Sequence, residues 1–88
     1  MADQIDQLIE FPCDHVFKVV GDSRETFMPD VHRAVCSVVP VSLDAVKTRS
    51  SGNGKYLSVS VVARLENREQ LLAIYAGLKK IAGIRFLL

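Results

Sequence analysis

Cationic and hydroxyl side chains recur at alternate positions of the apolar stretches in this chain, where together they could bind an anion. Lys18 interrupts the first apolar stretch, and Arg85 interrupts the last one. Lysine and arginine beside serine hydroxyls can hold a carboxylate or a phosphate through charge-assisted hydrogen bonds. The candidates for such a ligand or partner surface are Lys18, Lys47, Arg49, Ser58, Ser60 and Arg85.

The turn after the first apolar stretch is a second candidate site for an anion. Its sequence is "GDSRE", residues Gly21–Glu25. Gly21 has no side chain, so a ligand could approach the backbone closely, and the amides as far as Ser23 could hold a carboxylate. The simpler interpretation is that Gly21 permits the turn and Ser23 caps it. The residues alone leave both interpretations open.

The loop "SSGNG" (residues 50–54) raises the question of a phosphate-binding loop. A loop of the Walker type precedes a helix and contains a lysine next to serine or threonine. Here an alternating apolar stretch follows, so no helix N-terminus is available to an anion. Gly52, Asn53 and Gly54 tolerate the positive φ that a hairpin requires, so we predict a plain hairpin turn.

Residues capable of catalysis or metal binding are scattered along the chain. Cys13 and Cys36 match no metal or redox spacing. His15 and His32 have no serine or cysteine held beside them by the sequence. We therefore predict no enzymatic activity, no metal and no cofactor.

The composition is that of one small globular domain with balanced charge. The 88 residues are 49% hydrophobic and 24% charged, with a net charge of +1. Such a chain is neither disordered nor membrane-embedded. A dedicated nucleic-acid-binding protein usually carries a large basic excess, so we do not expect a nucleic-acid partner. A core of this size is small, so formation of a homodimer would supplement its stability.

The N-terminal segment 1–14 is expected to be an arm that precedes a single domain at 15–88. Ile5, Leu8 and Ile9 follow helical spacing, which indicates a short amphipathic turn. Acidic residues stand where a signal peptide needs a basic region, and no apolar run is long enough to cross a bilayer. We therefore expect a cytoplasmic protein with reduced thiols.

Apolar periodicity predicts a strand and a helix in the first half of the chain. The stretch His15–Gly21 reads as a strand, with Phe17 and Val19 toward the core because burial of an unpaired Lys18 would be costly. An apolar stripe from 27 to 38 is typical of an amphipathic helix. Proline in a helix interior removes a hydrogen bond, so we predict that regular helix starts near residue 28 with Pro29 in its first turn.

The second half of the chain predicts a hairpin, a helix and a final strand. The stretches 43–49 and 55–65 read as strands joined by the glycine-rich loop. Asn67 and Gln70 have the spacing of a capping box before the second helical stripe, and Gly83 can take the left-handed cap. In the final strand, 84–88, strict alternation places Phe86 toward the core and Arg85 on the opposite side.

This order of elements predicts a ferredoxin-like α+β sandwich. Right-handed crossovers in both strand–helix–strand units produce a four-stranded antiparallel sheet with strand order 4-1-3-2 and both helices on one face. The other face would be open, and the cationic and hydroxyl candidates would lie on it.

Several short motifs resemble those of the YbeD-like family of small bacterial proteins. In chain order they are "LIEFP", "FKVVG", "VKTRSSGNGKYLSVSV" and "YAGLKKIAGIRFLL". The resemblance runs from about residue 8 to residue 88. It implies the same topology, in a version similar to ACT regulatory domains, and a protein of uncharacterised role that is sometimes called a lipoate regulatory protein.

Two functions are consistent with these features. The first is a non-enzymatic regulatory or interaction domain that docks a protein partner through the open basic face or through the edge strand. The alternative is a sensor of ACT type, which would bind a small anionic metabolite near Gly21–Ser23 or over Lys18. An RNA-recognition module shares the topology but needs aromatic rings on the open face. With Phe17 in the core and only Tyr56 near the start of the third strand, the sequence predicts no such platform.

Overall fold

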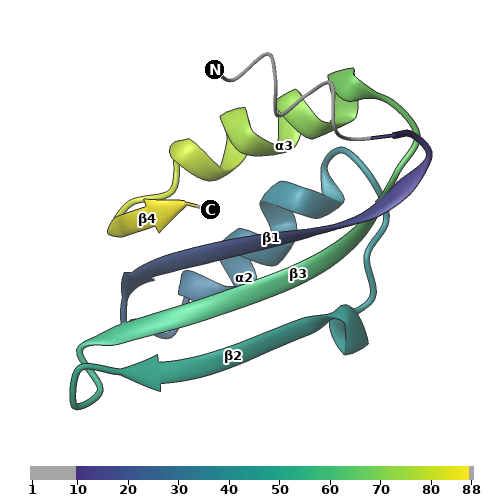
Figure 1. Cartoon of the computed structure of the whole chain (residues 1–88). Helices are drawn as coiled ribbons and strands as arrows, with labels where there is room; N and C mark the ends of the chain where they lie inside the picture. Colours follow the sequence, from purple (N-terminus) through teal and green to yellow (C-terminus); the bar gives the residue numbers. More distant parts are fainter. Residues whose placement is uncertain (1–9, 88) are drawn as a thin grey trace.

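The computed structural model describes residues 10–87 and confirms the expected order of elements (Figure 1). The elements are β1 (Cys13–Asp22), α2 (Phe27–Cys36), the 3₁₀ turn η1 (Leu43–Ala45), β2 (Val46–Ser51), β3 (Tyr56–Leu65), α3 (Arg68–Lys79) and β4 (Ile84–Leu87). The helical turn expected over 5–9 lies outside the described residues. Neither helix between residues 10 and 87 is long and apolar enough to cross a membrane.

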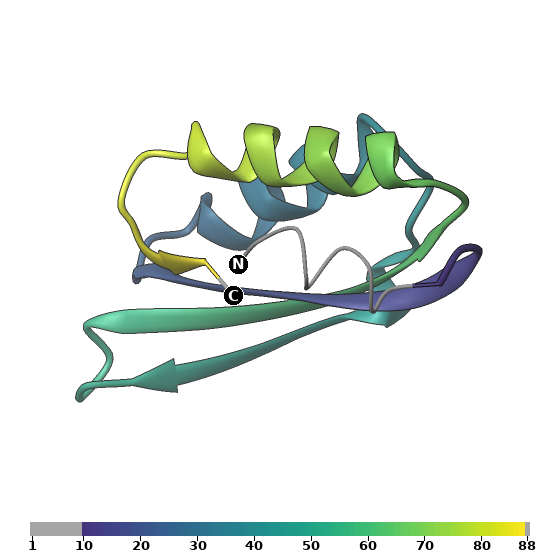
Figure 2. The same cartoon turned by 45° about the horizontal axis from the view of Figure 1, so that its top comes forward.

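The strands form one antiparallel sheet in the order β2-β3-β1-β4. Both helices cover the same face of this sheet, and the opposite face carries no element of the described chain (Figure 2). This is the ferredoxin-like topology with the predicted strand order. The central strands β1 and β3 pair along their whole lengths, from Cys13 opposite Leu65 to Asp22 opposite Tyr56.

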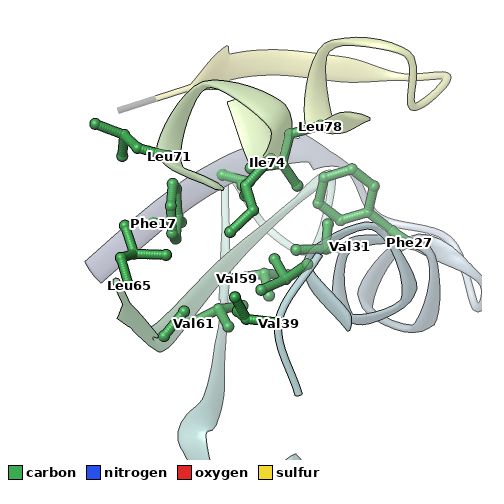
Figure 3. Packing of buried hydrophobic residues seen from close by; sticks show 13 residues of the cluster. Phe17, Phe27, Val31, Val39, Val59, Val61, Leu65, Leu71, Ile74 and Leu78 are labelled. Carbon is green, nitrogen blue, oxygen red and sulfur yellow. The ribbon is translucent and has the colours of Figure 1, made fainter. Parts of the chain in front are cut away.

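The core lies between the sheet and the two helices (Figure 3). Alternate residues of β1 and β3 point inward, including Phe17 and Val19 as predicted, and the helices contribute the matching apolar stripes. The buried set is Phe17, Val19, Phe27, Val31, Val35, Val39, Val59, Val61, Ala63, Leu65, Leu71, Ile74 and Leu78. Because one set of strand positions is buried, the other set must lie on the open face.

Local signals in the sequence place the starts of both helices correctly, whereas the glycine expected to cap the second helix lies beyond its end. Helix α2 begins at Phe27, with Pro29 in its first turn, where a missing N–H costs nothing. The Asn67 side chain accepts a hydrogen bond from the Gln70 amide at 2.9 Å, and Gln70 Oε1 accepts one from the Glu66 amide at 2.7 Å. Gly83 has a φ of +83° as expected, although it lies three residues beyond the C-cap at Lys80.

The glycine-rich loop is a hairpin turn, as predicted. Gly52, Asn53 and Gly54 have φ values of +59°, +58° and +86°. The Gly54 amide donates to the Ser51 carbonyl at 3.1 Å, which closes the turn between β2 and β3.

Two expectations about strands are wrong. The strand expected at 43–49 starts only at Val46, because the Ala45 amide bonds back to the Ser42 carbonyl and closes a 3₁₀ turn. The first strand also starts earlier than expected, at Cys13, since pairing with β3 continues to Leu65.

The orientation of Phe86 is a further correction. Val20 of β1 pairs with Phe86 and Gly21 pairs with Ile84, so Arg85 is the extra residue of a bulge. A bulge interrupts the two-residue alternation of a strand. Phe86 therefore lies on the open face beside Val20, 65% exposed, instead of in the core.

Candidate functional site

Three polar side chains form a central row across the open face of the sheet. Lys18 on β1 pairs with Ser60 on β3, and Ser60 pairs in turn with Lys47 on β2. Neighbouring strands lie about 4.8 Å apart, so the backbones of the two lysines are separated by about 10 Å. The next row toward the hairpin contains Ser58 paired with Arg49. The pairing thus brings these predicted site residues together on one surface.

The cations in and beside the central row have no acidic partner among the described residues. Within residues 10–87, Lys18, Lys47 and Arg49 form no ion pair. At the end of the face beyond this row, Arg64 Nη1 lies 3.6 Å from Asp14 Oδ1. Uncompensated positive charge is therefore concentrated over the middle of the face, where an anionic partner would find electrostatic complementarity.

Arg85 is on the open side as predicted, but it is displaced from Lys18. The bulge places Arg85 between the positions opposite Val20 and Gly21. Its Nε donates to Asp22 Oδ1 at 2.9 Å. The hydrogen bond and the charge of Asp22 raise the pKa of Arg85 above its ordinary value. Arg85 is thus paired within the chain and is not part of the free positive charge.

A groove of about 510 Å³ lies at the hairpin end of the open face. Its lining consists of Val20, Ser51, Tyr56, Arg85 and Phe86. Two aromatic rings from β3 and β4 thus flank Val20 of the intervening strand. Alternation alone misses this groove, because only the pairing of β4 with β1 reveals the bulge that turns Phe86 outward.

A second apolar patch lies on the other side of the central row. Val16 of β1 pairs with Val62 of β3, and their exposed fractions are 54% and 42%. Sequence alternation places both on the open face. A directly opposed pair of exposed valines is apolar surface that a partner could bury.

The turn after β1 is filled by the chain itself. Gly21 is buried, and a Cβ at this position would lie 2.3 Å from Phe27 Cζ, so the glycine makes room for the Phe27 ring. The Asp22 amide donates to the Gly83 carbonyl and the Ser23 amide to the Lys55 carbonyl, both at 2.9 Å. The space beside Gly21 is therefore occupied by the Phe27 ring, and the Ser23 amide is already bonded within the chain. The N-cap residue of α2 is Thr26, three residues after Ser23.

Arg24 connects this turn to the loop before β4. Its Nη2 donates to the Ala82 carbonyl at 2.7 Å, and its Nη1 donates to Asp30 Oδ2 at 3.1 Å and to the Thr26 hydroxyl. The guanidinium carbon lies 5.7 Å from the centre of the Phe27 ring. Arg24 is thus paired with a carboxylate of the same chain, that of Asp30.

His32 and Cys36 meet on α2, although the sequence reasoning found no such pair. Cys36 Sγ lies 3.3 Å from His32 Nε2, and both atoms contact the Val41 carbonyl oxygen, at 3.3 and 2.7 Å. Their i, i+4 spacing is the signal that indicates this contact. A carbonyl oxygen only accepts hydrogen bonds, so His32 Nε2 carries the proton and cannot take one from the thiol. The pair therefore anchors the loop after α2.

His15 lies under α3 in an aromatic cluster. Its ring contacts Phe17 edge-on at 4.7 Å between centroids, and its Nε2 lies 3.3 Å from the Tyr75 hydroxyl oxygen. Burial lowers the pKa of His15 and raises that of Tyr75. Residues 10–87 contain no group of three His, Cys, Asp or Glu side chains that could hold a metal ion.

The topology and the open face define the class as a small α+β domain of ferredoxin-like topology. The chain resembles the solution structure of protein HP0495 from H. pylori, with a TM-score of 0.69 and 16% identity, over 100% of this chain and 93% of that one. At this identity the likeness shows the fold alone.

The chain belongs to the family described as "Protein of unknown function (DUF493)", whose pattern matches residues 6–88. A UPF0250 protein of Shewanella loihica is 38% identical over 80 residues, which cover 90% of this chain and 89% of the relative. A UPF0250 protein of Haemophilus ducreyi is 36% identical over 85 residues, with coverage of 97% and 87%. These relatives confirm the resemblance to uncharacterised small bacterial proteins of YbeD-like type.

Proposed function

We propose that this protein is a non-enzymatic, regulatory interaction domain of the cytoplasm that docks a partner protein on its open sheet face. The observation that carries the proposal is the central row of Lys18, Ser60 and Lys47, whose cations have no ion pair within residues 10–87. Apolar side chains are exposed on both sides of this row. Complementary charge directs encounter and orientation, while burial of apolar area contributes affinity.

The β2 edge offers a second contact for the same partner. Strand β2 borders the sheet and has β3 as its neighbour. Its outer backbone groups could pair with an added strand, a known mode of peptide recognition. Lys47 and Arg49 lie on this strand, so a partner paired there would also lie near the free cations.

Site-specific crosslinking in the native host tests the docking surface. We would replace Ser60 with photoreactive benzoylphenylalanine and use Ala76, exposed on α3, as the matched control position. We expect one discrete adduct from position 60, none from position 76, and loss of the adduct when Lys18→Glu is added. Equal adducts at both positions, or none at position 60, would contradict docking on this face.

A small-ligand sensor is the second candidate, and the groove is the observation that favours it. Its volume of about 510 Å³ is within the range of sites for small molecules. Lys18 is the next outward residue of β1 after Val20 of the lining, so the ligand would be a small anionic metabolite with an apolar part. A concentration-dependent rise in melting temperature across a panel of organic acids would support this function, as mass action requires. An unchanged melting temperature at millimolar ligand would exclude those acids as ligands.

A further inference from the structure

We infer that the segment docked on the open face is an acidic amphipathic helix lying along β1, with a carboxylate between two apolar side chains on its contact face. This inference rests on the proposed function and specifies the partner chemistry. It follows from the order of side chains along β1 and from the charge of the face. It also follows from the requirement that the backbone N–H and C=O groups of the docked segment have hydrogen-bond partners.

The middle three outward residues of β1 are a lysine between two valines, while Asp14 and Asp22 at the ends of the strand are paired with Arg64 and Arg85. Val16, Lys18 and Val20 follow each other on the open face. Successive outward residues of a strand are about 6.7 Å apart. Val62 widens the first apolar position and Phe86 widens the last, because each pairs directly with its β1 neighbour.

These side chains therefore form three bands across the sheet. The first is apolar, and the middle one is the central row, whose lysines form no ion pair within residues 10–87. The third is apolar on β1 and β4, at Val20 and Phe86, and continues into Ser58 and Arg49 on β3 and β2. A complementary surface presents an apolar, an acidic and a second apolar group at the same spacing.

A helix provides that spacing, and its backbone N–H and C=O groups bond to each other within the helix. Residues i, i+4 and i+8 of a helix rise about 6 Å at each step, close to the repeat of the bands. The mismatch is about 1.4 Å over the whole stripe, or about 0.7 Å at each end when the carboxylate is centred over Lys18. A lone extended segment on a sheet face would leave its N–H and C=O groups without partners in the interface. A helix about 10 Å wide also covers two strand spacings, so it reaches from β1 to both neighbouring strands.

Charge argues against a second copy of this chain as the occupant. A two-fold contact whose axis passes through the middle of this face would place the central row of one copy against that of the other. Lysines would then oppose lysines, and like charges in an interface are costly.

The distribution of aromatic rings argues against single-stranded nucleic acid. Stacking needs aromatic side chains along the path of the strand. Tyr56 and Phe86 both lie at the hairpin end, whereas the exposed side chains at the opposite end include the aliphatic pair Val16 and Val62. That pair offers no ring to a base and no cation to a phosphate.

The test is an NMR titration of the full ¹⁵N-labelled chain with two synthetic helical peptides. The acidic peptide carries Leu, Glu and Leu at i, i+4 and i+8, and the matched control carries Leu, Lys and Leu in the same alanine-rich scaffold. We expect saturable shifts with the acidic peptide only, confined to Val16, Lys18, Val20, Ser60, Val62 and Phe86. Because like charges repel in an interface, Lys18→Glu should weaken this binding at least about tenfold and allow the lysine peptide to bind.

Exposed Lys18 makes no ion pair within residues 10–87, so the variant should keep its fold, which its amide spectrum will verify. Absence of shifts at millimolar acidic peptide, or equal binding of both peptides, would overturn the inference. So would tighter binding of a 12-nucleotide oligouridine to the same residues, which would indicate nucleic acid instead. If the peptides fail while the crosslink from position 60 persists, the helix geometry is wrong and docking on this face stands.

Discussion

Val20 on β1 pairs directly with Phe86 on β4, and this pairing places the Phe86 ring on the open face. The ring then forms one wall of the groove whose other aromatic wall is Tyr56. A residue that strict alternation assigns to the core is therefore part of the candidate binding surface. The distinction can be measured, because exposed and buried phenylalanines respond very differently to truncation.

Phe86→Ala should leave the free energy of unfolding nearly unchanged. The side chain is 65% exposed, so we expect a loss below about 1 kcal/mol in urea denaturation. Phe17→Ala is the matched control, because Phe17 is fully buried and its truncation should cost about 3–5 kcal/mol. Similar losses in the two variants would show that Phe86 is buried in solution.

Gly21→Ala should destabilise the protein through overpacking. Its Cβ would lie 2.3 Å from Phe27 Cζ and 2.9 Å from the Gly83 carbonyl oxygen, and Phe27 is fully buried. Added methyl groups in a tight core typically cost about 1–3 kcal/mol.

A double-mutant cycle with Phe27→Leu separates this clash from other effects of Gly21→Ala. The smaller side chain should relieve part of the strain, which would appear as favourable coupling between the two positions. Additive losses would mean that the Phe27 ring is not what requires glycine at position 21.

His15 should make stability depend on pH in the mildly acidic range. Burial lowers its pKa in the folded state below the ordinary 6.5, so between these two values the unfolded state binds more protons. The stability that neutral His15 contributes is fully present above pH 6.5 and is lost as the pH falls through the folded-state pKa. The free energy of unfolding should therefore decrease on acidification below about pH 6.5.

His15→Gln removes the titrating group and should flatten this part of the profile. Carboxylates also titrate at lower pH. We would therefore compare the free energies of unfolding of the two proteins at each pH from 5 to 8. Parallel profiles would show that His15 does not contribute to the dependence.

Asn67→Ala should weaken the start of α3. The Asn67 side chain accepts the Gln70 amide at 2.9 Å, and loss of such a cap typically costs about 1 kcal/mol. Asn67→Asp retains the acceptor and adds a negative charge favoured by the helix dipole, so it should retain stability. Equal destabilisation by Ala and Asp would contradict a capping role.

The sequence by itself determined the elements, their order and most of the inward and outward assignments. Inward Phe17 and outward Lys18 follow from period-two alternation, because burial of an unpaired lysine is costly. The start of α2 follows from Pro29, and the cap of α3 follows from Asn67 and Gln70, since these are local backbone effects. The hairpin follows from glycines that accept positive φ.

Only the tertiary structure decided what depends on pairing between distant strands. Alternation in β4 cannot reveal that Arg85 is a bulge residue, because the bulge exists only relative to β1. That one extra residue turns Phe86 outward and moves Arg85 to Asp22, away from Lys18. The cross-strand register in turn assembles Lys18, Ser60 and Lys47 into the central row, since neighbours in a sheet are set by strand order and not by sequence distance.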